Sequence, residues 1–232
     1  MTLSLKQHKV FEIAAVLGLM LLVKEFADRY ELIGAGSIAM WCGIILATLF
    51  MRKQNISWRD KGLTLPHGMK GWLKAFGIAL LVIAASLVVL GGFIPLLSEL
   101  MGLTIPESST DRFEFFLGNI WLFLAYLLFV IWMGAAVGEE LLMRGFLLNH
   151  LIVLFGDRKA GITAALILHA GIFGMLHISQ GIPGIIGTAL VAVILGVVYL
   201  FTNRKLFPLI LAHGLINSLS LTAYFVTDGG IA

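Results

Sequence analysis

Apolar residues follow one another in long blocks along this chain, and short polar segments separate the blocks. The blocks cover residues 8–24, 32–51, 71–98, 115–135, 137–155, 160–178, 182–202 and 206–226. Most of these blocks have the ~20 residues that a helix needs to cross the ~30 Å hydrocarbon core of a bilayer. The pattern therefore predicts an all-α fold, a polytopic transmembrane helical bundle with about eight spans.

The composition favours lipid over water as the solvent of these helices. Hydrophobic residues make up 59% of the 232 residues, and charged residues make up 12%. A soluble domain usually holds ~45–50% apolar residues even with Gly included. No repeat or soluble domain interrupts the blocks, so we interpret residues 1–232 as a single membrane domain, with N-terminal spans over 1–114 and core helices over 115–226.

The first block resembles a signal peptide, because Lys6 and Lys9 precede an apolar run. Glu12 interrupts that run and no convincing small-residue cleavage site follows, so we interpret the block as a retained first span. Cys42 is the single cysteine, which excludes a disulfide framework within the chain. The scattered charges, with a net of +3, give no reason to expect nucleic acid as a partner.

Basic residues gather in the connection 52–70, whereas acidic residues dominate 99–114. The positive-inside rule then places 52–70 and the N-terminus in the cytoplasm and 99–114 outside. Two later basic pairs, Arg158–Lys159 and Arg204–Lys205, would lie outside if every block crosses the membrane. Either the block 137–155 does not fully cross or these two loops break the rule, and the sequence leaves both alternatives open.

One apolar block contains the charged stretch GEELLMRG at residues 138–145. A charge at the middle of a membrane helix costs ~2.5–3.5 kcal/mol on insertion scales, so these side chains need partners. Glu140 and Arg144 share a helix face and can neutralise each other, whereas Glu139 lies about 100° around the helix. We expect Glu139 to be free as a general acid or base. The alternative is a salt cluster at a helix end, which predicts no polar residues deeper in other helices.

Polar residues do occur in the later apolar blocks. His177 follows Phe173 by four residues, and Asn217 follows His213 by four residues, so each pair shares a helix face. Ionisable groups in a membrane bundle normally face inward and towards one another. These residues and the Glu-Glu-Arg cluster therefore predict one inward-facing site. We expect His169 to pack or line a cavity, and His150 to be interfacial.

Three motifs occur in order: Glu139-Glu140-Leu-Leu-Met-Arg144, Phe173-Gly-Met-Leu-His177 and His213-Gly-Leu-Ile-Asn217. Together they resemble the CPBP family of intramembrane proteases, which is also called ABI and includes CAAX proteases and bacteriocin-processing proteins. The resemblance covers residues 115 to 226. It implies an intramembrane endopeptidase of a bacterial plasma membrane that acts on a peptide or protein substrate, which in some members is lipidated.

The resemblance also implies roles for the motif residues. Glu139 and His177 would activate a water molecule, His213 and Asn217 would form the oxyanion hole, and Glu140, Arg144 and Phe173 would support them. We favour a mechanism without a cofactor, because the Arg144 cation disfavours a second cation beside it. The alternative is a Zn²⁺ ion held by Glu139, His177 and His213.

Two other functions are compatible with the sequence. One is a non-catalytic membrane scaffold or bacteriocin self-immunity protein of the same fold, and the other is a small transporter, which the lack of paired broken helices disfavours.

Geometry also imposes a condition on the site. His213 is only about seven residues into its block, so that helix must tilt, begin deeper or break for His213 to reach Glu139.

Overall fold

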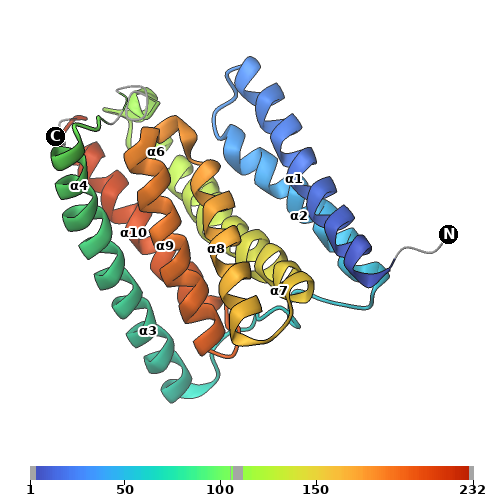
Figure 1. Ribbon diagram of the computed structural model, residues 1–232. Helices are drawn as coiled ribbons and strands as arrows, with labels where there is room; N and C mark the ends of the chain where they lie inside the picture. The colour runs from blue at the N-terminus through green and yellow to red at the C-terminus, as the bar shows by residue number, and fades with distance from the viewer. Residues whose placement is uncertain (1–3, 105, 107–111, 230–232) are drawn as a thin grey trace.

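The computed structural model describes residues 4–104, 106 and 112–229 of the chain, and within them helices are the only regular secondary structure. Figure 1 shows the arrangement. The helices are α1 (Leu5–Arg29), α2 (Ala35–Lys53), α3 (Gly68–Val88), η1 (Val89–Phe93), α4 (Ile94–Met101), η2 (Glu114–Phe116), α6 (Ile120–Tyr126), η3 (Leu127–Leu148), α7 (Asn149–Phe155), α8 (Lys159–Met175), η4 (Ile178–Gln180), α9 (Gly181–Phe201) and α10 (Phe207–Val226). The all-α prediction is confirmed for this part of the chain. Glu107 and Asp111 of the predicted external connection lie outside the described residues.

The number of spans differs from the prediction. Five helices of the described chain are long and apolar enough to cross a membrane, and α8 is a shorter apolar helix. These five are Ala35–Lys53, Gly68–Met101, Ile120–Phe155, Ile178–Phe201 and Phe207–Val226. A total of about eight spans is therefore not confirmed.

The separate spans 115–135 and 137–155 are wrong, because α6, η3 and α7 form one continuous helix of 36 residues from Ile120 to Phe155. The residues at the expected break, Gly134 to Gly138, include no proline or polar turn residue that would end a helix. Gly134 instead permits close packing, because a Cβ atom there would collide with the Ser37 side chain of α2. The middle segment of the long helix, η3, has the wider hydrogen-bonding pattern of a π-helix.

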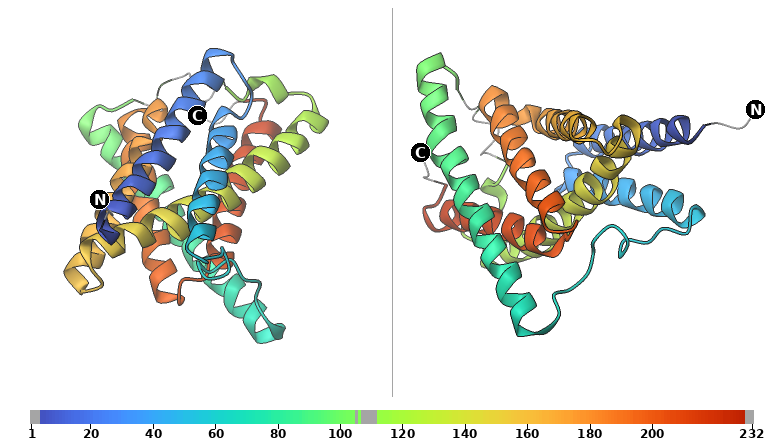
Figure 2. Two further views of the ribbon diagram at one scale, coloured as in Figure 1. Left: turned by 90° about the vertical axis from the view of Figure 1, so that its right-hand side faces the viewer. Right: turned by 60° about the horizontal axis from the view of Figure 1, so that its bottom comes forward.

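The long helix lies in the centre of the bundle (Figure 2). It contacts α2 and α1 on one side and α8 and α10 on the other. Consecutive large side chains of its second half are fully buried, including Leu142, Met143 and Phe146. Gly214 lets α10 approach closely, because a Cβ atom there would lie 2.6 Å from the Trp132 ring. This approach brings α10 against the charged stretch of η3.

Three connections meet at one end of the bundle, the lower end in Figure 1, and we call this the basic end. They are residues 54–67, 156–158 and 202–206. Leu206 N donates to Gly62 O over 3.0 Å, and the Tyr199 hydroxyl donates to Lys61 O over 2.8 Å. Because 120–155 is a single helix, both later basic pairs lie at the same end as the basic connection 52–70. The block 137–155 is therefore the second half of one long helix and not a separate span.

Candidate active site

The charged stretch of η3 forms a buried ion pair near the middle of the long helix. Arg144 Nη1 donates to Glu140 Oε1 over 2.9 Å, and both side chains are 0% exposed. The expected pairing of Glu140 with Arg144 is therefore present. The alternative of a salt cluster at a helix end does not hold, because the helix extends from Ile120 to Phe155.

His213 of α10 joins this pair from the neighbouring helix. Its Nδ1 lies 2.9 Å from Glu140 Oε1, and its Nε2 lies 3.8 Å from Glu139 Oε2. An ionised carboxylate can only accept hydrogen bonds, so Nδ1 donates to Glu140 when Glu140 is charged. Glu140 therefore fixes the ring of His213 with its Nε2 towards Glu139.

Glu139 does not lie near the start of a helix, because the helix begins at Ile120 and not near residue 137. Glu139 lies well inside that helix, at a depth that His213 reaches without a break in α10. His213 therefore reaches Glu139 because Glu139 lies deeper than expected and because the two helices approach closely at Gly214.

The second motif contacts the ion pair through Phe173. The Phe173 ring is buried in α8, and its centroid lies 5.0 Å from Arg144 Cζ, a cation–π distance. His177 stacks at 4.7 Å between ring centroids, and its Nδ1 donates to Phe173 O over 2.9 Å. In the described chain, no hydrogen bond or ion pair joins His177 to Glu139 or His213.

Asn217 lies one helical turn after His213 on α10 and is half-buried. The structure thus brings Glu139, Glu140, Arg144 and His213 into one cluster. Phe173 contacts the cluster directly, His177 adjoins Phe173, and Asn217 follows on the face of His213.

Several buried polar atoms in and near this cluster have no hydrogen-bond partner in the described chain. They are Glu139 Oε2, Glu140 Oε2, Arg144 Nε and Nη2, and both ring nitrogens of His169. Buried polar groups in proteins nearly always bond to protein or to ordered water. These atoms therefore keep hydrogen-bonding capacity that the described residues do not use. His169, expected to pack or line a cavity, is 0% exposed.

The zinc alternative has no matching geometry in this structure. Within the described residues, no group of three or more His, Cys, Asp or Glu side chains could hold a metal ion. Glu139, His177 and His213 are thus not arranged as a ligand set here, and Arg144 already neutralises Glu140.

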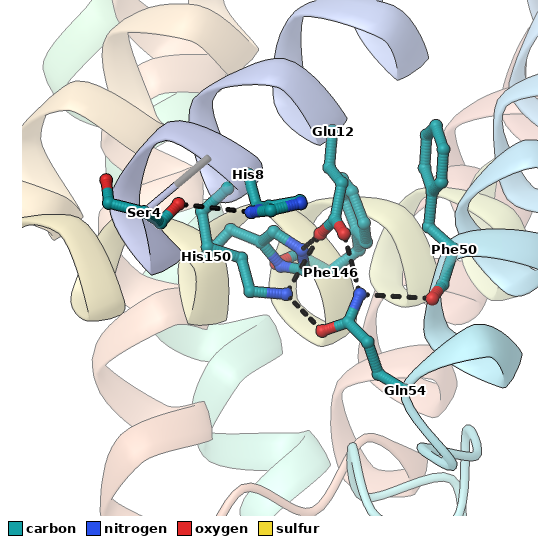
Figure 3. Close-up of polar contacts among 8 residues, drawn as sticks. Ser4, His8, Glu12, Phe50, Gln54, Phe146 and His150 are labelled. Carbon is teal, nitrogen blue, oxygen red and sulfur yellow. Dashed lines mark hydrogen bonds and ion pairs between the residues drawn. The ribbon is translucent and has the colours of Figure 1, made fainter. Parts of the chain in front are cut away.

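A second polar cluster, which sequence reasoning missed, ties α1 to the long helix (Figure 3). Glu12 accepts hydrogen bonds from Lys9 over 2.9 Å and from Gln54 over 2.6 Å, and its Oε2 lies 2.7 Å from His150 Nε2. His150, which we expect to be interfacial, is 2% exposed and is buried within this cluster. The signal that could have revealed the cluster was Glu12, a charge inside an apolar run.

A helical membrane bundle with a buried glutamate, arginine and histidine cluster defines a candidate membrane hydrolase. Residues 120–219 match the family model described as type II CAAX prenyl endopeptidase Rce1-like. The matched segment contains all three motifs, and the match confirms the resemblance to the CPBP family over this part of the chain. No curated protein and no solved structure matches the chain significantly.

Proposed function

We propose that the protein is an intramembrane endopeptidase in which Glu139 activates the water that hydrolyses a peptide bond. One observation carries the proposal: the buried Glu139 Oε2 has no hydrogen-bond partner in the described chain, and it lies 3.8 Å from His213 Nε2. A carboxylate oxygen without a partner, beside an imidazole from another helix, can accept a proton from a water molecule bound between them.

The reaction needs a base, donors for the oxyanion and a proton for the leaving amine. Glu139 takes a proton from water, and the resulting hydroxide attacks the peptide carbonyl carbon. Asn217 Nδ2 and His213 Nε2 donate to the oxyanion that forms. When the intermediate collapses, the C–N bond breaks and Glu139 returns its proton to the amine, which leaves a carboxylic acid and a free amine.

The protonation of the two histidines follows from their partners. His177 Nδ1 donates to the Phe173 carbonyl, so Nε2 of the neutral ring carries a lone pair that can accept from the same water. His213 Nδ1 donates to Glu140, so Nε2 can donate to an oxyanion only when the ring carries both protons. Glu140 and Arg144 position His213 and do not contact the reacting atoms.

The basic end is proposed to face the cytoplasm. With 120–155 as one span, and with α1 and α8 also crossing, the basic connections 52–70, 156–159 and 202–205 all lie on the side of the N-terminus. The positive-inside rule then holds at every connection without an exception. We propose a bacterial plasma membrane protein with a cytoplasmic N-terminus, whose substrate is a peptide, and the Rce1-like description favours a lipidated one.

The proposal is tested with purified protein in detergent and a set of fluorogenic peptides, each with and without a prenyl group. We expect His213→Ala and Asn217→Ala each to slow cleavage about 10²–10³-fold, the usual effect of losing one oxyanion donor. His177→Ala should also slow it, and a metal chelator should leave the rate unchanged. His67→Ala, which removes an exposed histidine of the basic connection, is the control and should cleave at the wild-type rate.

Two outcomes would contradict the proposal. Cleavage abolished by a chelator and restored by Zn²⁺ would replace the metal-free mechanism with the zinc alternative. A folded protein that cleaves none of the peptides, with the same partner binding or immunity in wild type and His213→Ala, would favour the non-catalytic scaffold.

A further inference from the structure

A cavity of about 400 Å³ opens at the basic end, and none of the residues of the proposed reaction lines it. It is lined by Lys61, Asn149, Ile152, Val153, Gly156, Asp157 and Arg204. These residues come from three connections and from the last turns of the long helix, so the cavity forms only when these segments come together.

Two cations of this cavity have spare hydrogen-bonding capacity. Arg204 Nη1 donates to the neutral side chain of Asn149 over 2.8 Å. Among the described residues, no carboxylate lies within ion-pair distance of Lys61 or Arg204, although Asp157 also lines the cavity. The guanidinium and ammonium groups therefore have donors available for an anion.

Positive charges from α1 and from the connection 202–206 lie near Lys61. Burial lowers the pKa of Lys61, and the charges of Lys9 and Arg204 lower it further, while Asp60 opposes them weakly. A bound anion would relieve this repulsion and would stabilise the charged lysine.

Buried hydrogen bonds hold the walls of the cavity in place. Asn149 Nδ2 donates to Arg144 O over 2.8 Å and to the Tyr199 hydroxyl over 3.0 Å. The Tyr199 hydroxyl in turn donates to the Lys61 carbonyl, and Tyr199 is 0% exposed. The backbone of Lys61 and the side chain that orients Arg204 are thus fixed before any ligand binds.

We propose that this cavity binds a phosphate group, supplied by the headgroup of an anionic phospholipid. Basic pockets between transmembrane helices bind anionic headgroups in this way, and arginine suits a phosphate through its paired donors. Val153 lines the same cavity and is 42% exposed, so an apolar surface for an acyl chain adjoins the charged one. The inference does not depend on peptidase activity.

The test uses the full chain, purified in a neutral detergent, and follows thermal unfolding as phosphatidylglycerol is added. Phosphatidylcholine and inorganic phosphate are titrated in parallel. We expect phosphatidylglycerol to raise the Tm of the wild type, and Lys61→Gln and Arg204→Gln each to need about fivefold more of this lipid for the same rise. Neither variant should unfold the protein, because the Tyr199 bond uses the Lys61 carbonyl and Arg204 is exposed at the surface.

Arg59→Gln and Arg158→Gln serve as matched controls, since both remove an exposed cation of the basic end that does not line the cavity. They should respond to phosphatidylglycerol as the wild type does. Stabilisation by phosphatidylglycerol but not by inorganic phosphate supports the lipid source, and equal stabilisation by inorganic phosphate supports a soluble phosphate compound at the same site. No stabilisation by either, or an equal loss in the two control variants, overturns the proposal.

Discussion

Removing one partner of the Glu140–Arg144 pair should destabilise the fold more than removing both. Among the described residues, Arg144→Leu leaves the buried Glu140 carboxylate with only His213 as a partner, and Glu140→Leu leaves the Arg144 guanidinium at 0% exposure without an ion-pair partner. Breaking a buried ion pair by deleting one partner usually costs ~3–5 kcal/mol.

The double variant should behave differently, because two apolar side chains of similar volume replace both charges. Such replacements are often neutral or stabilising. Here His213 Nδ1 also loses its acceptor, and an unsatisfied buried donor costs about 1–3 kcal/mol. We therefore expect each single variant to lose ~3–5 kcal/mol and the double variant to lose no more than about 3 kcal/mol.

The assay is equilibrium unfolding in mixed micelles with increasing dodecyl sulfate, followed by the loss of helical circular dichroism. The four proteins of the cycle are compared at one temperature, and the coupling energy is the sum of the single effects minus the double effect. Additive losses, with a double variant that loses ~6–10 kcal/mol, would refute the view that these charges stabilise each other inside the bundle.

Two further stability predictions concern the N-terminal half. Gly62→Ala should destabilise the protein by at least ~1–3 kcal/mol in the same unfolding assay, because Gly62 has a φ of +96° and a Cβ atom would collide with the Arg204 carbonyl oxygen. Gly77→Ala, where nothing lies within 4 Å of the added atom, should be neutral or stabilising. Glu12→Gln should cost about 3 kcal/mol, because it removes the acid that partners a buried Lys9, whereas Glu25→Gln on the exposed face of α1 should stay within about 0.5 kcal/mol.

The parts of the fold that depend on local pattern could be predicted from the sequence. The four-residue spacing predicted the Glu140–Arg144 pair, since neighbours on a helix face meet whatever surrounds them. The same spacing predicted no partner for Glu139, and Glu139 Oε2 has no hydrogen-bond partner in the described chain.

The features that depend on contacts distant in the sequence could not be predicted. The blocks 115–135 and 137–155 predict a break at residue 136, but the helix continues there and packs closely on Ser37 of another helix at Gly134, a neighbour that only the structure reveals. A break there would place Glu139 near a helix end, whereas Glu139 lies in the interior of the long helix. Glu12 and His150 are likewise 138 residues apart, so no local spacing could pair them.

The cleavage rate of Glu139→Gln shows whether Glu139 is the base of the reaction. The amide keeps the size of the side chain but cannot take a proton from water, so we expect the rate to fall ~10²–10⁴-fold while the Tm stays near that of the wild type. A folded Glu139→Gln protein that cleaves the peptide within a few-fold of the wild-type rate would show that Glu139 is not the base.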